Sequence, residues 1–235
     1  FSNNVSLSIK LKNELRYGEN SHQKAAVYCE NSVKSGIINA TQLNGKQLSY
    51  NNYSDADAAF NLVMEFTEPT TAIIKHANPC GTASSNNILE SYLKAFEADS
   101  KSAFGGIVAF NDKVEADLAE EISKIFYEVI IAPSYSQAAI DILKKKKNLR
   151  ISKVSLKKDQ KKTEIKSISG GFLMQETDNK ILNSFDLVQA GEASASEEEI
   201  KQLIFAMSVC KHVKSNAIVI VNDFQTVGIG AGQTS

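Results

Sequence analysis

Helical and extended hydrophobic patterns alternate along the chain from about residue 55 onward. Ala59, Phe60, Val63 and Met64 recur at helical spacing, and residues 71–75 (TAIIK) then form a short apolar run that is typical of a buried strand. The pattern repeats, with further helices expected around residues 88–96, 114–125, 140–143 and 196–207 and further strands at residues 106–110, 128–132 and 217–221. This alternation predicts an α/β fold with a largely parallel sheet.

Capping and turn residues indicate where these elements begin and end. Ser54 before the first helix and Ser196 before the last are each followed three residues later by an acidic residue, which is the spacing of a helix N-terminal cap. After the first strand, residues 78–81 (NPCG) predict a turn, because proline and glycine both favour chain reversal. Lys75 and His76 are therefore expected at the carboxyl end of that strand.

Two polar segments interrupt the alternation and indicate a boundary between two lobes. They are residues 157–164 (KKDQKKTE) and residues 186–196. We expect a first lobe over residues 1–185 and the beginning of a second, incomplete lobe over residues 186–235. The last ten residues (TVGIGAGQTS) contain no helix pattern, cap or polar tail, so we expect that the chain is cut short there.

Composition and charge narrow the class of protein. With 235 residues, 43% of them hydrophobic, the chain is long enough to bury a substantial core. A formal net charge of -1 gives no overall attraction to nucleic acid or to an anionic membrane, so neither is expected as a partner. The sequence shows neither a leader pattern nor an apolar run of membrane-spanning length, and a cytoplasmic protein is expected.

The cysteines indicate neither a disulfide framework nor a zinc site. Cys29, Cys80 and Cys210 lie far apart and form no C-x-x-C pair. Zinc nucleobase deaminases use H-x-E followed by P-C-x-x-C, and residues 76–83 (HANPCGTA) match this pattern without its glutamate or second cysteine. No metal is therefore expected in the chemistry. The basic run at residues 144–147 is expected to be a solvated helix end and not a phosphate site.

Polar residues near strand ends are the candidates for chemistry, because ligands in open α/β sheets bind outside the carboxyl ends of the strands. Lys75 and His76 suit acyl or formyl transfer, since a histidine can accept a proton at neutral pH and an adjacent ammonium can stabilise developing negative charge. In isolation, a solvated lysine and a hydrogen-bonded turn histidine explain the same two residues. Residues 102–105 and Glu128, which precede strands, and residues 215–216 (SN) are further candidates.

Two other groups of residues could bind a ligand. Arg16 and Tyr17, in an early loop, pair a forked cation that suits phosphate or carboxylate with a ring that can stack on a heterocycle. A surface pair without a ligand explains them equally well. Gly228, Gly230 and Gly232 give G-x-G-x-G after a strand, but the dinucleotide fingerprint requires its third glycine three residues after the second, at the opening of a helix.

Six short motifs, taken in order, resemble the AICAR transformylase family. They are residues 15–23 (LRYGENSHQ), 43–46 (LNGK), 75–81 (KHANPCG), 102–106 (SAFGG), 130–133 (IIAP) and 228–233 (GIGAGQ). The resemblance implies cytidine-deaminase-like lobes, each with three α/β/α layers. It also implies transfer of a formyl group from 10-formyltetrahydrofolate to the 5-amino group of the ribonucleotide AICAR, in a homodimer whose active sites lie between subunits.

The resemblance further implies roles for individual residues. His76 corresponds to the proton acceptor, Lys75 to the residue that stabilises the tetrahedral transition state, and Asn216 to a residue that orients the reacting amine. The family's substrate-binding positions correspond to Arg16, Tyr17, Phe104, Gly105 and Glu128.

The chain departs from the family pattern in several places. Ser21 stands where the family has proline, and the arginine expected after residue 235 lies outside the sequence. The N-terminal IMP cyclohydrolase domain, which makes proteins of this family bifunctional, is also absent from these residues. The alternative to an enzyme is therefore a nucleotide-binding or interaction module that keeps the pocket without catalysis.

Overall fold

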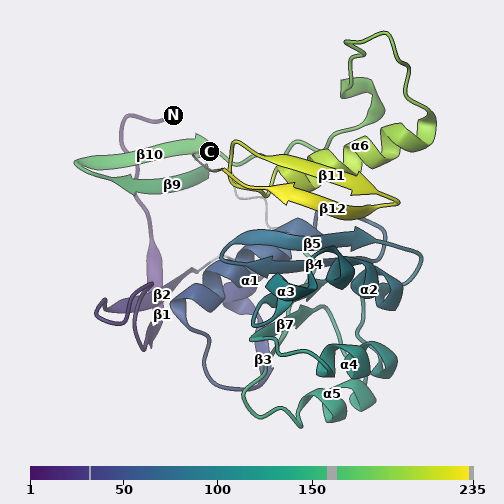
Figure 1. Ribbon diagram of the computed structural model, residues 1–235. Helices are drawn as coiled ribbons and strands as arrows, with labels where there is room; N and C mark the ends of the chain where they lie inside the picture. Colours follow the sequence, from purple (N-terminus) through teal and green to yellow (C-terminus); the bar gives the residue numbers. More distant parts are fainter. Residues whose placement is uncertain (32, 158–162, 233–235) are drawn as a thin grey trace.

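The computed structural model in Figure 1 describes residues 1–31, 33–157 and 163–232 of the chain. The polar segment over residues 157–164 thus falls largely outside the described residues, as do residues 233–235 at the end of the glycine-rich motif. Within the described ranges, no helix is both long and apolar enough to cross a membrane.

An eight-stranded sheet forms the centre of the molecule, in the order β11-β12-β5-β4-β6-β7-β8-β3. Its strands are β3 (Thr41–Asn44), β4 (Thr70–Lys75), β5 (Asn78–Ser84), β6 (Ile107–Phe110), β7 (Val129–Ala132), β8 (Arg150–Lys153), β11 (Ile218–Asn222) and β12 (Gln225–Gly230). Among these described strands, β6 with β7 and β7 with β8 pair in parallel, and the other pairs are antiparallel. The α/β class is confirmed, but the mainly parallel sheet is wrong: the sheet is mixed.

The connections between strands explain this mixture. A two-residue turn joins β4 to β5, so these strands must run antiparallel. Helix α2 (Ile88–Ala98) then carries the chain from β5 past β4 to β6, which leaves β5 and β6 pointing the same way with β4 between them. The helical spacing located this helix, but it could not show that β5 precedes the helix or that β4 separates the two strands that the helix joins.

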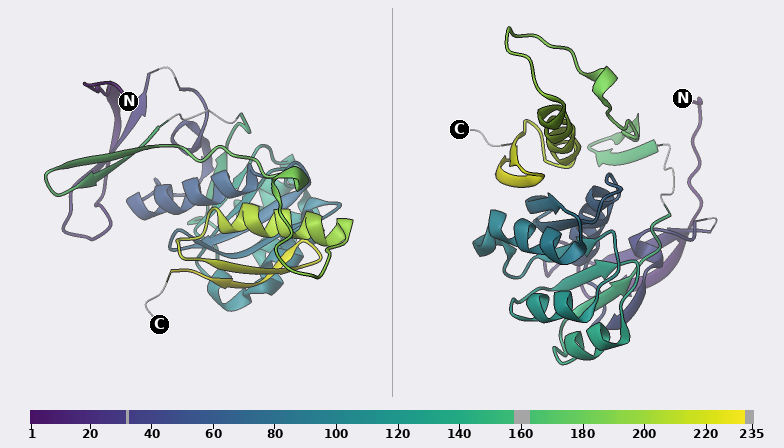
Figure 2. Two further views of the ribbon diagram at one scale, coloured as in Figure 1. Left: turned by 90° about the horizontal axis from the view of Figure 1, so that it is seen from above. Right: turned by 90° about the vertical axis from the view of Figure 1, so that its right-hand side faces the viewer.

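Helices cover both faces of the sheet and give the expected three layers (Figures 1 and 2). Helices α1 (Tyr50–Val63) and α6 (Glu197–Cys210) share one hydrophobic core with Ile74 of β4. Helices α2, α4 (Ala116–Ser123) and α5 (Gln137–Leu143) share the other core with Ile73. Successive side chains of a strand point to opposite faces, so the inner strands must be apolar on both sides. This explains their continuous apolar runs.

The start of α1 differs from the prediction. Its N-cap is Ser49 and not Ser54: the Ser49 hydroxyl accepts from the Asn52 amide, and the Asn52 side chain accepts in return from the Ser49 amide. Asparagine completes this capping box, so a pattern that required an acidic residue missed it. The capping box of Ser196 and Glu199 at the start of α6 is confirmed.

Two hairpins lie outside the main sheet and were not predicted. They are β1 (Ile9–Leu15) with β2 (Ala25–Glu30), and β9 (Thr163–Ile168) with β10 (Gly171–Glu176). The lobe boundary expected near residue 185 falls in residues 177–196, where the regular element is the short 3-10 helix η2 (Ser184–Asp186), and it stays a prediction. Beyond that stretch, β11 and β12 join the main sheet.

Candidate active site

The turn between β4 and β5 presents Lys75 and His76 at one edge of the sheet. The turn residues are His76 and Ala77, whose φ angles are 53° and 58°. Both lie in the left-handed region, as a two-residue hairpin requires, at a cost of about 1–2 kcal/mol for each residue that carries a Cβ. His76 is therefore held in a conformation that a histidine does not ordinarily adopt.

The turn predicted over residues 78–81 is wrong, because these residues begin β5. Pro79 pairs with Ile74 beside a register shift, where the missing amide of proline is tolerated. Gly81 is needed inside the strand for another reason. A Cβ at this position would lie 1.9 Å from the carbonyl oxygen of Ala95, so the glycine allows α2 to approach β5 closely.

A cavity of about 520 Å³ opens beside Lys75 and His76. Its wall combines the β4–β5 hairpin with Asp99 and Ser102, at the junction of α2 and α3 (Ser100–Ala103), and with Gly228 of β12. Three of the segments predicted to be functional thus meet at one cavity, although they are far apart in the sequence. Its volume is that of a small-molecule site.

Lys75 is fixed by the segment that leads into β6. Its Nζ donates to the carbonyl oxygen of Phe104 over 2.8 Å. Gly105 has φ +69°, and a Cβ there would lie 3.0 Å from the Lys75 Nζ, so a larger residue would be strained and would crowd the ammonium. The Phe104 ring is 63% exposed and lies 5.4 Å from the Phe126 ring. An aromatic surface therefore borders the lysine.

Glu128 lies just before β7 and is held by two partners. The side-chain amide of Asn52, near the start of α1, donates to its Oε2 over 2.7 Å, and the Arg150 guanidinium lies 3.8 Å from the same oxygen. The backbone amide of Glu128 donates to the carbonyl oxygen of Gly106. Glu128 is not among the described residues that line the cavity, so its carboxylate forms a second polar position on the same edge of the sheet.

Arg16 and Tyr17 follow β1, in the loop where they were expected. The Arg16 guanidinium carbon lies 5.6 Å from the centre of the Tyr17 ring. The side chains of Gln47 and Asn51 donate to the carbonyl oxygens of Glu14 and Glu19, which brings this loop to the start of α1. Since Asn52 in the same turn of α1 holds Glu128, the loop lies on the Glu128 side of the site and not at the cavity.

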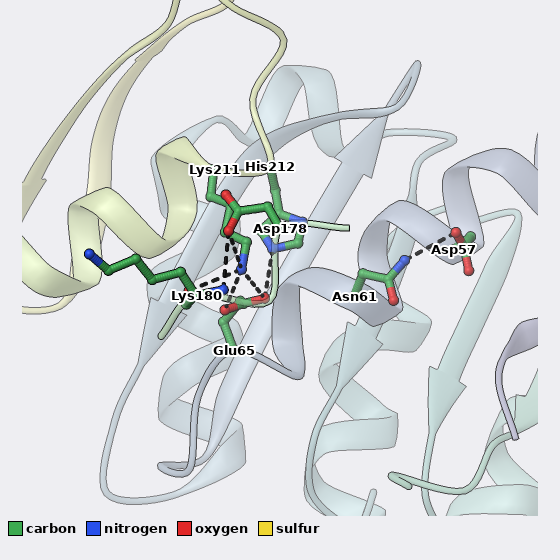
Figure 3. Close-up of polar contacts among 7 residues, drawn as sticks. All are labelled: Asp57, Asn61, Glu65, Asp178, Lys180, Lys211 and His212. Carbon is green, nitrogen blue, oxygen red and sulfur yellow. Dashed lines mark hydrogen bonds and ion pairs between the residues drawn. The ribbon is translucent and has the colours of Figure 1, made fainter. Parts of the chain in front are cut away.

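The segment after α6, residues 211–216, contains Asn216 and is held by contacts to other parts of the chain. Lys211 and His212 each lie 3.2 Å from the carboxylate of Glu65, whose side chain is only 5% exposed (Figure 3). Further along the segment, the Lys214 amide donates to the side chain of Asn78 over 3.3 Å.

Asn78 links this segment to the turn. Its side-chain nitrogen also donates to the carbonyl oxygen of His76 over 3.1 Å. On the other side of the segment, the amide of Gly232 donates to the carbonyl oxygen of Lys214 over 2.7 Å. Asn216 thus follows, two residues later, a residue that contacts the hairpin directly.

Comparisons with known proteins show the family to which the chain belongs. The family model described as AICARFT/IMPCHase bienzyme matches residues 1–235. The chain belongs to the AICARFT/IMPCHase bienzyme family. Similar relatives, each named bifunctional purine biosynthesis protein PurH, are 51% identical over 99% of the chain in Listeria monocytogenes, 50% over 100% in Caldicellulosiruptor saccharolyticus and 46% over 100% in Acetivibrio thermocellus. The chain covers 46% of each relative, and so spans about half of their length.

The strand ends that meet at the candidate site of this bienzyme-family chain differ from the expectation. The sequence predicted carboxyl ends of parallel strands. Of the strands involved, β4 does contribute its carboxyl end, but β5, β6 and β7 contribute their amino ends. The antiparallel direction of β4 brings Lys75 beside the residues that precede β6 and β7. Gly105 therefore lies beside the lysine, and Glu128 lies on the same edge of the sheet, because both residues precede their strands.

Cys80 lines the cavity, and its surroundings favour a protonated thiol. Burial raises the pKa of its thiol to about 12, with the nearby Asp99 carboxylate adding to the effect, and its Sγ lies 3.4 Å from the carbonyl oxygen of Ile73. Among the residues that the structure describes, no group of three or more His, Cys, Asp or Glu side chains could hold a metal ion. Cys80 is a half-buried residue of β5.

Three side chains that organise the site were not predicted: Asp55, Glu65 and Asn78. Each acts on a segment distant in sequence, so no local pattern marks it. Asp55 lies on α1 and Glu65 just after its end, and both resemble ordinary polar positions of an amphipathic helix. Asn78 was assigned to a turn. The signal that could have found it was its place two residues after His76 in the family motif.

Proposed function

We propose that this chain carries the front half of an AICAR transformylase active site. The observation that supports it is the meeting of Lys75 and His76 at the wall of a 520 Å³ cavity, in a chain of the AICARFT/IMPCHase bienzyme family. The reaction is formyl transfer from 10-formyltetrahydrofolate to the 5-amino group of AICAR, a step of purine biosynthesis. The name of the relatives, bifunctional purine biosynthesis protein, is consistent with this reaction.

In the proposed mechanism the 5-amino nitrogen attacks the formyl carbon and a C–N bond forms. His76 accepts the proton that the amine must lose, and the Lys75 ammonium stabilises the negative charge that develops on the formyl oxygen. The bond between the formyl carbon and N10 of the folate then breaks, and tetrahydrofolate leaves with a proton on that nitrogen. Asn216 orients the amine toward the formyl carbon.

Substrate binding is assigned to the two sides of the Lys75 edge. Arg16 and Tyr17 suit the phosphate and base of the ribonucleotide, and Glu128 suits a ribose hydroxyl. Phe104 offers an exposed ring and Gly105 an unobstructed backbone next to Lys75. No metal is assigned a role. We further propose a homodimer with sites between subunits, in a longer protein that also carries IMP cyclohydrolase activity.

A turnover assay with His76→Ala tests this proposal. In the full-length protein the substitution is expected to lower kcat for formyl transfer to AICAR by about 10²-fold or more, because the attacking amine loses its proton acceptor. Lys75→Ala is expected to lower kcat by a similar factor, since it removes the charge that stabilises the oxyanion. The measurement is tetrahydrofolate release from 10-formyltetrahydrofolate in the presence of AICAR.

Lys113→Ala is the matched control, because Lys113 lies on the surface in an ion pair with Glu115 at 2.6 Å and outside the cavity lining. It should leave kcat unchanged. Undiminished turnover by the His76 variant would contradict the assignment of the base. Binding of AICAR in calorimetry without any turnover by the unaltered protein would favour the binding-module alternative.

A further inference from the structure

The turn that carries His76 is supported from outside by one carboxylate. Asp55 projects from α1, and its Oδ1 accepts a hydrogen bond from the backbone amide of Ala77 over 2.8 Å. His76 and Ala77 both have φ angles in the left-handed region, 53° and 58°. Strained residues of this kind persist only where the surroundings hold them. The Asp55 contact is such a restraint, and it acts directly on the second turn residue.

Asp55 is well placed to act as a fixed support. It lies in the second turn of α1, next to Ala56, which is fully buried in the core that α1 shares with Ile74 of β4. The helix is anchored at its start by the Ser49–Asn52 capping box. The carboxylate is therefore carried by a rigid element that packs on the same strand that ends at His76.

Asp55 also lies between the two polar positions of the site. Burial raises the pKa of its carboxyl, and the nearby carboxylate of Glu128 acts in the same direction. The amide of Ala77, the imidazole of His76 and the amide of His76 lower it. The groups that face Asp55 are thus the turn on one side and Glu128 on the other.

We propose that Asp55 is a positioning residue, which holds the His76–Ala77 turn in its left-handed form so that the imidazole of His76 points to the reacting amine. This inference rests on the proposed role of His76 as proton acceptor. The backbone angle at His76 sets the direction of its side chain. A turn that relaxes to ordinary φ values would aim the imidazole elsewhere, and the hydrogen bond to Ala77 prevents that relaxation.

The hydrogen bond and the negative charge of Asp55 can be separated by substitution. Asp55→Asn keeps an oxygen that can accept from the Ala77 amide and removes the charge, whereas Asp55→Ala removes both. In the full-length protein, Asp55→Ala is expected to lower kcat by about tenfold to 10²-fold with KM values for both substrates changed by less than about threefold, as for a misplaced catalytic group. Asp55→Asn is expected to keep kcat within about threefold of the unaltered protein.

A second substitution, made in the Asp55→Ala variant, tests the conformational explanation. Glycine adopts left-handed φ angles without strain and is the preferred second residue of such a turn. Ala77→Gly added to Asp55→Ala should therefore recover at least about threefold of the lost kcat. Asp57→Ala is the matched control, because Asp57 lies on the same helix as Asp55 and its carboxylate accepts from Asn61 over 3.0 Å (Figure 3).

Three results would overturn the proposal. They are unchanged kcat in Asp55→Ala, a loss in Asp55→Asn as large as that in Asp55→Ala, and failure of Ala77→Gly to recover activity. The second result would mean that the charge matters and not the hydrogen bond. His76→Ala, measured beside them, separates this inference from the proposed function. If that variant is fully active, the function fails; if it is inactive while Asp55→Ala is active, only the positioning role fails.

Discussion

At the scale of single residues, a side chain that lines the cavity is not necessarily reactive, and Cys80 is the example. Cys80 lines the same cavity as Lys75 and His76, but its thiol is largely buried and lies near the carboxylate of Asp99. Both effects oppose formation of a thiolate, and together they raise its pKa to about 12. The thiolate is the nucleophilic form of cysteine. We therefore expect Cys80 to line the cavity without acting as a nucleophile.

Thiol labelling as a function of pH tests this conclusion. A thiol with a pKa of about 12 is neutral at pH 8 to 10, so Cys80 should stay unlabelled by iodoacetamide over this range in the folded protein. Labelling should begin only as the pH approaches 12, provided that the fold survives. Mass spectrometry of the peptide that contains Cys80 measures it.

The control is the same protein unfolded in urea, in which burial is lost and Cys80 should react at the rate of an ordinary thiol. Rapid labelling of Cys80 in the folded protein at pH 8 would show that the thiol is accessible and would contradict the burial seen here.

At the scale of elements, the end of α6 is fixed by a buried ionic cluster. Glu65, just after α1, lies within 3.2 Å of both Lys211 and His212, and Lys211 is only 15% exposed. Asp178, from the stretch before η2, lies 3.9 Å from Lys211 and adds a second carboxylate. Figure 3 shows these side chains converging from three segments. Since residues 213–216 follow directly, the cluster also fixes the start of the segment that contains Asn216.

Replacing Glu65 with alanine should loosen α6. The substitution leaves the ammonium of Lys211 largely buried without its main carboxylate and removes the partner of the His212 ring, which costs about 3 kcal/mol where a partner of a buried ion pair is removed. That cost corresponds to a roughly 100-fold loss of protection from hydrogen–deuterium exchange in the last turn of α6 and in residues 211–216. Exchange followed by mass spectrometry on the full-length protein measures it.

Asp57→Ala is again a suitable comparison. It removes a carboxylate from α1, and this carboxylate is hydrogen-bonded to Asn61 at the surface. Its effect on α6 should be negligible. Equal protection of α6 in the Glu65 and Asp57 variants would mean that apolar packing through Phe205 and Val209 holds the helix, and that the ionic cluster adds nothing.

At the scale of the whole molecule, side chains join the β11–β12 hairpin to the rest of the sheet. The ladder between β12 and β5 consists of one residue pair, Gln225 with Ala83. Beside it, the buried Thr226 hydroxyl accepts from the Thr82 amide over 3.0 Å and donates to the Thr82 carbonyl oxygen over 3.2 Å. Lys94 of α2 adds an ion pair of 2.6 Å with Asp223. The cavity wall formed by β12 depends on this joint.

Thr226→Val should weaken the joint while preserving its shape. Valine has the volume of threonine but no hydroxyl, so the Thr82 amide loses its buried partner, at a cost of about 1–3 kcal/mol. For a domain of this size that lowers the melting temperature by at least about 2 °C. Calorimetry of the full-length protein measures the shift.

Thr226→Ser keeps the hydroxyl and loses only a methyl group, so its free energy of unfolding should stay within about 1 kcal/mol of that of the unaltered protein. A valine variant as stable as the serine variant would show that the Thr226 hydroxyl does not join β12 to β5.

The sequence by itself located several helices and inner strands and the candidate pair Lys75 and His76. Helical spacing located α2, α4 and α6, and short apolar runs located β4, β6 and β7, because amphipathic periodicity is a property of neighbouring residues. The family motifs drew attention to Lys75 and His76 for the same reason, since both residues and their neighbours are contiguous in the chain.

Tertiary structure alone decided which strands pair, in which direction, and which side chains hold the site. The direction of β4 depends on β5 and β6 on either side of it, and this long-range pairing leaves no local pattern. The restraint of Asp55 on Ala77 and of Glu65 on Lys211 joins residues that are distant in sequence. Such contacts exist only once the sheet has assembled, so the partner of a polar position on α1 is decided by what folds against it.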